Sequence, residues 1–486
     1  MSSSTEVLFD PRVAVADLRS TSYSDMDTSG GLSHALNRMA ELLGWGMVGR
    51  GPFGAVVHPG AKVLVKPNWV LHENQGPWGI EPLVTHASVV KTIVEELLRG
   101  QPSSVSVGDA PIQGCDFDRL LDVTGLAGWC EQLLKAEPRF GGIRDFRRTK
   151  CVVRGGLREA FEDQVPLDHF ILFDLGSRSL LEPVTGRGAA FRVTQYDPAQ
   201  LVRTHGPGRH QYLIARDVIE ADVIVNLPKL KTHKKAGLTC ALKNLIGING
   251  NKEYLPHHRL GGSSDGGDCY PGTSWIKRTL ESAYDRLNHS PSAAGRRAWA
   301  AGARILLRAA RVSGDRFGVE GSWSGNDTIW RTCLDLNRIL LYGRADGTLA
   351  DEPQRQVIHV VDAIMAGQGD GPLSPQPFAL GLLLAGGSAA AVDWVAAELL
   401  GYDPQRIPIA REAFGNFRWP LSTFPSSAIQ LVGALGAGAV DQVLASDRVL
   451  HPISYPSGWL DAVRVRPDAS DSGRSTSADE LSARWP

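Results

Sequence analysis

The chain has 486 residues, with 51 Lys and Arg against 52 Asp and Glu. A chain of this length can bury a large core, and its balanced charge argues against nucleic acid or an anionic membrane surface as a partner. Any strongly positive site must therefore be local.

The six cysteines are scattered and include no Cys-x-x-Cys pair. They indicate neither a disulfide framework nor a zinc or iron–sulfur cradle, so no intrinsic iron–sulfur cluster is expected. The first residues, MSSSTEVLFDPRVAVADL, lack the order of a signal peptide, and no apolar run reaches the roughly 18 residues of a spanning helix. We expect a cytoplasmic protein without a membrane partner, and whether it forms a homo-oligomer stays open.

Up to residue 110, apolar runs typical of strands alternate with amphipathic runs typical of helices. Strands are predicted over 12–18, 62–70 and 104–110, and helices over 31–43 and 86–100. A strand, a helix and a strand at these lengths form a βαβ unit, which implies a parallel sheet with right-handed crossovers.

Further strands are predicted over 168–175, 221–228, 356–364 and 380–387, followed by a helix over 389–401. Their nearly unbroken apolar runs suit strands that are covered on both faces. The expected fold class is therefore α/β, with a mainly parallel sheet and helices on both faces.

Two segments depart from this alternation. Between 250 and 330, a Gly/Ser/Asp-rich loop (261–274) precedes an Arg/Ala-rich helical stretch (293–312), which we interpret as an insertion or lid. Residues 467–486 are polar and low in apolar content, so a disordered tail is predicted there. Residues 1–466 are predicted to form a single large α/β domain.

The densest positive charge lies in NLPKLKTHKKAGLTCALKNLIG, residues 226–247. A buried strand ends at its start, and GLTCALKNLIG is predicted as a helix that stops near Gly247. Lys229, Lys231 and His233 then lie between a strand's carboxyl end and a helix's amino end, where free N–H groups and the helix dipole favour an anion. Ligands of open α/β sheets also bind at this edge, so an anion site is predicted here.

The neighbours of this motif allow two interpretations each. Lys243 and Asn244 lie among apolar residues of the predicted helix, where Lys243 either snorkels to solvent or joins the site. If Lys234 and Lys235 point outward, they add only long-range attraction. The histidines downstream either lie on the surface or reach back over the site, at positions 257 and 258.

Polar side chains also end other predicted strands. Lys66 and Asn68 end one strand, Asp109 the next, and Asp362 a later one, with Asp370 in the glycine-rich loop behind it. Each alone is explained as a turn or cap residue, but together they predict one site at the sheet edge. The glycine-rich loop is not a Walker motif, and no G-x-G-x-x-G opens the first βα turn, so nucleotide binding by either route is unsupported.

Several of these motifs together resemble one family. VKPNW, VSVGDAP, VNLPKLKTHKKAGLTCALKNLIGI, DAIMAGQGDGP and AAAVDWVAAELLGYDP are similar to successive signatures of the domain of unknown function 362 family, over about residues 62–404. The resemblance implies an α/β fold and an enzymatic or redox role without an assigned reaction. Many members carry a ferredoxin-like cysteine cluster, whereas this chain has none.

Three functions stay open. The first is an enzyme acting on a small anionic metabolite, carboxylated or phosphorylated, by Lys/His/Asp acid–base chemistry with or without a metal. The alternatives are a redox-partner or accessory protein that depends on another chain for electrons or cofactor, and a non-catalytic anion-binding module. The enzyme hypothesis assigns catalysis to His233, Lys231 and Asp109, substrate binding to Lys66, Asn68, Lys229, Lys243 and Asn244, and a divalent metal to Asp362 and Asp370.

Overall fold

The computed structural model describes ten stretches of the chain. The tail predicted over 467–486 lies outside them. The described residues are 6–18, 23–24, 30–154, 157–163, 165–186, 191–194, 196–290, 292–312, 318–444 and 453–464.

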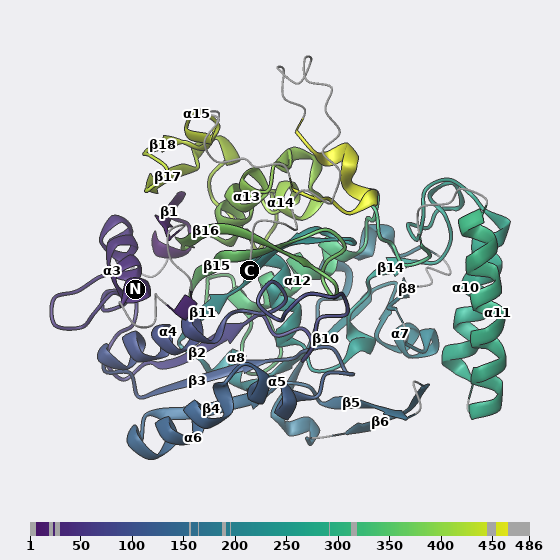
Figure 1. Cartoon of the computed structure of the whole chain (residues 1–486), viewed down its shortest axis with the longest axis horizontal. Helices are drawn as coiled ribbons and strands as arrows, with labels where there is room; N and C mark the ends of the chain where they lie inside the picture. Colours follow the sequence, from purple (N-terminus) through teal and green to yellow (C-terminus); the bar gives the residue numbers. More distant parts are fainter. Residues whose placement is uncertain are drawn as a thin grey trace.

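A large mixed sheet runs through the molecule (Figure 1). Its strand order is β18-β17-β1-β16-β15-β11-β2-β3-β4. The five strands from β15 to β4 pair in parallel, whereas β16 is antiparallel to both of its neighbours. The strand bounds are β1 Arg12–Asp17, β2 Lys62–Pro67, β3 Ser104–Asp109, β4 Phe140–Asp145, β11 Val223–Leu227, β15 Gln356–Gln368, β16 Gln376–Gly386, β17 Gln430–Gly433 and β18 Gly438–Ala439.

Helices cover both faces of this sheet because successive strand side chains point to opposite sides. Val63 and Val65 of β2 belong to one hydrophobic cluster, and Leu64 between them belongs to another. The expected α/β class with a mainly parallel sheet is confirmed. One face carries α3 Gly31–Leu43, α4 Ala87–Arg99, α5 Phe117–Val123 and α6 Leu126–Ala136, and the other carries α8 Arg216–Glu220, α12 Ile329–Tyr342, α13 Ala389–Leu399 and α14 Pro408–Glu412.

Smaller sheets surround the large one. The predicted strand over 168–175 is present as β7 Phe170–Asp174, but it pairs in an antiparallel sheet of its own with β10 Arg209–Ala215. One of its four apolar side chains faces outward, since Leu172 is 45% exposed. The other small strands are β5 Thr149–Arg154 with β6 Leu157–Asp163, β8 Phe191–Arg192 with β14 His258–Arg259, and β9 His205–Gly206 beside β10.

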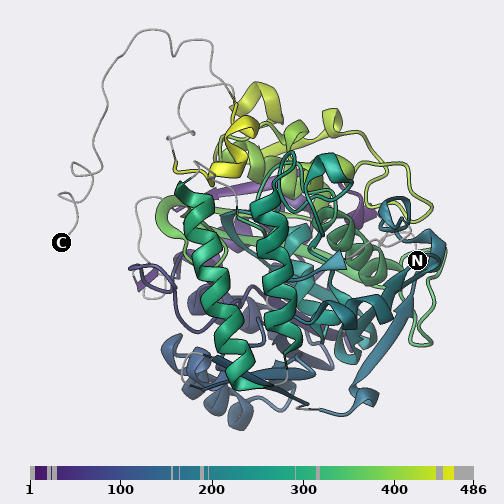
Figure 2. The same ribbon diagram turned by 90° about the vertical axis from the view of Figure 1, so that its right-hand side faces the viewer.

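The segment predicted as an insertion forms a pair of helices at one side of the molecule. They are α10 Trp275–His289 and α11 Ala293–Val312, and they lie side by side (Figure 2). Their buried contacts form a small cluster that includes Tyr270 and Leu280, separate from the sheet's core.

None of the helices in the described ranges is long and apolar enough to cross a bilayer. The remaining α-helices are α7 Pro198–Thr204, α9 Ala241–Asn244 and α15 Val440–Leu444.

The lysine-rich stretch folds differently from its prediction. Lys229–His233 is strand β12, which continues alongside β15 and turns back into β13, Gly237–Thr239. The turn places Gly237 at φ 83°, a left-handed conformation that favours glycine. The prediction of one helix over 237–247 is wrong, because only Ala241–Asn244 is α-helical and a 3₁₀ turn follows it. The short helix therefore offers no dipole-based anion site at residue 237.

Candidate functional site

A cavity of about 350 Å³ lies beside the carboxyl ends of β2 and β3, under the β12–β13 hairpin. Cationic and amide side chains dominate its polar lining. These groups come from segments that lie far apart in the sequence, and the sheet edge brings them together. The polar lining consists of Asn68, Gln75, Asp109, Gln113, Arg147, Thr194, Lys231, His233, Lys234, Lys235, Thr239, Lys243, Asn244, Asn249, Asn251, Lys252, His257 and Glu320.

The structure brings six of the ten predicted site residues into this lining. The remaining four serve internal ion pairs or lie elsewhere. Those in the lining are Asn68, Asp109, Lys231, His233, Lys243 and Asn244, and those outside it are Lys66, Lys229, Asp362 and Asp370.

Lys66 and Asp109 form a buried ion pair at the floor of the cavity. The Lys66 Nζ lies 2.7 Å from Asp109 Oδ1, and the Trp69 backbone N–H donates to Asp109 Oδ2 at 2.6 Å. Burial raises the pKa of Asp109, and the Lys66 ammonium opposes that rise. The Asp109 carboxylate is thus committed to partners within the protein, which gives it a positioning role and makes it a poor proton acceptor for a ligand.

Asn68 and Asn244 are fixed by a chain of amides. Asn244 Oδ1 accepts from Lys66 Nζ at 3.2 Å and from Asn68 Nδ2 at 3.0 Å, while its Nδ2 donates to Asn226 at 2.7 Å. Among the described residues, the buried Asn68 Oδ1 has no hydrogen-bond partner. Because a buried amide oxygen without a partner is unfavourable, this atom is available to a donor on a ligand.

Lys229 does not reach the cavity, contrary to its predicted role as an anion clamp. Its Nζ lies 2.9 Å from Asp362 Oδ2 and donates to the Tyr23 hydroxyl at 2.9 Å, and both charged side chains are fully buried. The pairing register of β12 against β15 shifts between Lys229 and Lys231, which separates the environments of the two lysines.

The predicted metal residues do not form a coordination site. Asp362 already accepts from Lys229, Tyr23 and the His86 backbone N–H, at distances of 2.7–2.9 Å. Asp370 is exposed on the turn that follows β15. Within the described ranges, no group of three or more His, Cys, Asp or Glu could hold a metal ion. The geometry therefore gives the predicted divalent cation no support.

Three buried lysines of the lining form no ion pair with any described carboxylate. Lys231 is fully buried and donates to the Leu83 carbonyl, and Lys235 donates to Thr194. For Lys243, 9% exposed, no hydrogen bond or ion pair is recorded within the described part of the chain. Burial lowers the pKa of all three ammonium groups, to about 8 for Lys235.

The suggestion that Lys234 and Lys235 both point outward is half right. Lys234 is about one-third exposed and pairs with Glu320 at 3.0 Å. Lys235 turns inward, and Glu320 opposes the fall of its pKa. Even with Glu320 counted, positive charge exceeds negative charge around the cavity.

His233 presents a hydrogen-bond donor to the cavity. Its Nδ1 accepts from the backbone N–H groups of Lys235 at 3.0 Å and Ala236 at 3.2 Å. Nδ1 must therefore carry the lone pair, which leaves the proton of the neutral ring on Nε2. Burial first, and then Lys243 and the neighbouring lysines, lower the pKa of His233 well below its usual value. Burial is the larger cause, and the lysines act in the same direction.

His257 lines the same cavity in the opposite tautomer. Its Nδ1 lies 2.6 Å from the Leu255 carbonyl, so Nδ1 carries the proton and Nε2 the lone pair. Burial and then Lys235 lower its pKa well below the usual value. In the sequence, the adjacent histidines at positions 257 and 258 are the feature that could have indicated this residue. The structure separates them, because His258 is buried on β14 outside the lining.

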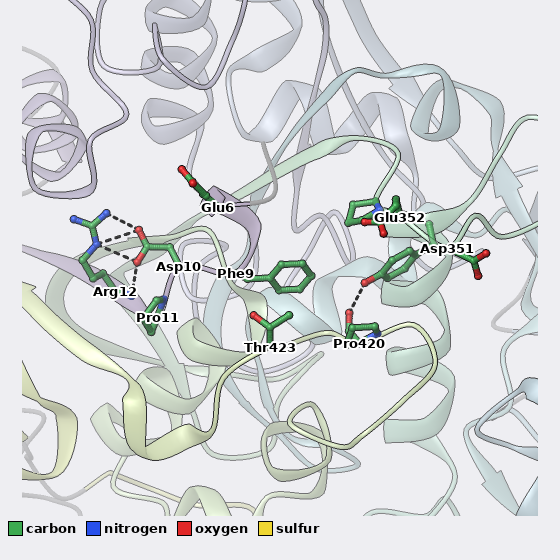
Figure 3. A pocket seen from close by; sticks show the side chains of 11 residues that line it. Glu6, Phe9, Asp10, Pro11, Arg12, Asp351, Glu352, Pro420 and Thr423 are labelled. Atoms are coloured by element: carbon green, nitrogen blue, oxygen red, sulfur yellow. Dashed lines mark hydrogen bonds and ion pairs between the residues drawn. The ribbon is translucent and has the colours of Figure 1, made fainter. Parts of the chain in front are cut away.

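A second hollow, of about 690 Å³, lies on another part of the surface (Figure 3). Glu6, Asp351 and Glu352 give it an acidic rim, and Asp10 is occupied by an ion pair with Arg12 at 2.6 Å. None of the ten predicted site residues lines it. The candidate site is therefore identified by the lysines and histidines that line the first cavity, and not by cavity volume.

Comparison with known proteins matches residues 178–398 to the family model described as "Domain of unknown function (DUF362)". The resemblance seen in the sequence is thus confirmed over this segment, which includes the hairpin and His257. A thylakoid-associated protein of Synechocystis sp. is 25% identical over 217 residues, and the match covers 44% of this chain and 44% of that protein. The chain thus matches less than half of that relative's length.

Two solved structures are distantly similar in fold. A Thermotoga maritima protein gives a TM-score of 0.36 at 10% identity, covering 79% of this chain and 60% of that one. The lactate racemase apoprotein of Thermoanaerobacterium thermosaccharolyticum gives 0.31 at 10% identity, covering 83% and 58%.

Proposed function

We propose that the protein is an enzyme acting on a small carboxylated or phosphorylated metabolite, held in the lysine-lined cavity and processed by histidine acid–base chemistry. One observation carries the proposal. The ammonium groups of Lys231 and Lys243 are buried beside a cavity without a described carboxylate partner. An uncompensated buried charge is strongly unfavourable, so a molecule that supplies the missing negative charge gains affinity from it.

The floor of the cavity supports the same proposal. The Lys66–Asp109 pair is neutral as a unit and holds Asn68 and Asn244 through hydrogen bonds. The amides can orient a bound anion while the lysines above them neutralise it. His233 and His257 supply a proton donor and a proton acceptor, which a purely anion-binding module would not need.

Ligand-induced stabilisation of the full chain tests the binding step. We would measure thermal midpoints and titration heats with inorganic phosphate, succinate and 2-oxoglutarate. At least one should bind, and each of Lys231→Met and Lys243→Met should weaken it by about 10- to 100-fold, since a hydrogen bond to a charged group contributes about 1.5–3 kcal/mol.

Lys135→Met is the matched control, because Lys135 is exposed on α6 and does not line the cavity. Its ligand affinity should equal that of the unmodified protein. Equal weakening in all three variants would show a diffuse charge effect and would refute the site. Absence of binding by all three probes would refute the proposed anion class.

A further inference from the structure

Accepting the proposed anion site as its basis, we propose that His257 and His233 form a base–acid pair that enolises a 2-oxo carboxylate held by the cavity lysines. The pairing follows from hydrogen bonds on the inner side of each ring. Two backbone N–H groups occupy His233 Nδ1, and the Leu255 carbonyl occupies His257 Nδ1. One ring therefore has an N–H group at Nε2 and the other a lone pair at Nε2, and both histidines line one cavity.

Local structure fixes these tautomers. His233 ends β12, and the chain turns directly after it, so the N–H groups of the turn reach back to its ring. His257 follows a 3₁₀ turn that ends at Tyr254, and its ring bonds to the carbonyl of Leu255. Flipping either proton would place two donors or two lone pairs against each other, which the buried setting penalises.

In the proposed reaction, the two groups act at the two ends of an enolisable carbonyl. His257 Nε2 takes the proton from the carbon next to the carbonyl, and the electron pair of that C–H bond forms the C=C bond. The C=O π pair moves to oxygen, which takes the Nε2 proton of His233. The reverse transfer restores the ketone, so atoms and electrons balance without a co-reactant.

The other polar groups favour this class of substrate. Lys231 and Lys243 neutralise the carboxylate, whose negative charge otherwise opposes the negative charge that develops on the enolate oxygen. The described lining contains no serine or cysteine; its hydroxyl groups are those of Thr194, which accepts from Lys235, and of Thr239.

Anion binding and proton transfer are coupled in this arrangement. In the empty cavity, burial and the positive charges of Lys235, Lys243 and Lys252 lower the pKa of His257. His233 is subject in the same way to Lys231, Lys235, Lys243 and a charged His257. A bound carboxylate offsets these charges and raises the pKa of His257, so the base strengthens when substrate is present.

Proton exchange in D₂O tests the proposal, with 2-oxoglutarate and pyruvate as probes and ¹H NMR as the readout. The unmodified chain should exchange the hydrogens next to the carbonyl faster than buffer. His257→Gln and His233→Gln should each slow this exchange by about 10²–10⁴-fold, the usual contribution of a general acid or base. Their affinity for the same probe, measured by calorimetry, should change by less than about threefold, because glutamine keeps a polar group without a transferable proton.

His258→Gln is the matched control, since this neighbouring buried histidine lies outside the lining. It should retain exchange. Probe binding without exchange in the unmodified chain would overturn the acid–base pair and leave the anion site standing, whereas no binding would refute the proposed function itself. A mass increase after borohydride treatment with pyruvate would show that a lysine activates the carbonyl, which would overturn the role of His233.

Discussion

Lys229 and Lys231 lie two residues apart on one strand, yet their side chains have different kinds of partner. Lys229 forms a buried ion pair with Asp362 and a hydrogen bond to Tyr23, so its charge is balanced within the fold. Lys231 lines the cavity, and within the described residues its ammonium group donates to the Leu83 backbone carbonyl and pairs with no carboxylate. The shift in strand register between them allows this difference. A dense basic motif can thus contain both ion-paired lysines and cavity-lining lysines, which sequence spacing does not separate.

Breaking the buried Lys229–Asp362 ion pair should have the largest effect on stability. Asp362→Asn leaves Lys229 buried and unpaired, so the free energy of unfolding should fall by about 3–5 kcal/mol. Urea denaturation measures this loss. The double change Lys229→Met with Asp362→Leu should recover most of it, because neither charge then remains buried. A loss below about 1 kcal/mol in the single variant would contradict the structural role of the pair.

Removing a cavity lysine should act in the opposite direction. Lys243→Met should raise the stability of the ligand-free chain by about 1–3 kcal/mol, since it removes a buried polar group without a described partner. The pKa of Lys243 in the folded chain is lowered, so the unfolded chain holds this proton more tightly. The cost is therefore present at neutral pH and fades as pH rises toward 10.5. Denaturation at pH 7 and pH 10 should show the gain of the variant shrinking, and a gain that grows would contradict this account.

Asp393, a buried carboxylate that pairs with no cation within the described residues, offers a third comparison. Burial raises the pKa of Asp393 to about 7, although the Leu242 N–H opposes the rise. Its folded pKa lies above its unfolded value, so stability is lost as pH rises toward 7. Below the folded pKa of Asp393, the free energy of unfolding falls by about 1.4 kcal/mol for each unit by which the pH rises. Asp393→Asn removes the titrating group, so about 1–2 kcal/mol of the loss between pH 6 and 8 should disappear in this variant. Thermal midpoints across this range measure it, and an unchanged pH slope would contradict the prediction.

The smallest effect is expected at the cavity rim. Lys234 and Glu320 are each about one-third exposed, so water and salt screen their attraction. Lys234→Gln should change the free energy of unfolding by less than about 1 kcal/mol. A larger loss in urea denaturation would show that this pair also supports the fold.

Most of the sheet and its covering helices could be predicted from the sequence. The apolar runs and helical spacing place β1, β2, β3 and α3 to within three residues of their observed ends, because these elements bury regular apolar faces. The same reasoning fails at residues 237–247. Apolar residues there occur at helical spacing, but the segment is buried from all sides, and a fully buried strand cannot be told from a helix by periodicity.

The candidate site was predictable by place more than by role. The polar strand ends indicate the correct sheet edge, since Asp109, Asn68 and Lys231 do line one cavity. The sequence could not tell which lysine meets a carboxylate, because Asp362 is 133 residues from Lys229. The sequence also could not distinguish His257 from a surface histidine, because the backbone carbonyl of Leu255 that fixes the position of its proton is identified only in the structure.

Gly247 shows how tightly three distant positions depend on one another. A Cβ atom there would lie 1.9 Å from Asp109 Oδ1 and 2.7 Å from Lys66 Nζ. No alanine fits unless that ion pair moves, and the ion pair holds Asn244 in place. In descendants of this chain, a residue larger than glycine at position 247 should therefore appear only together with a change at position 66 or 109, so such a residue would indicate that the floor of the cavity was lost.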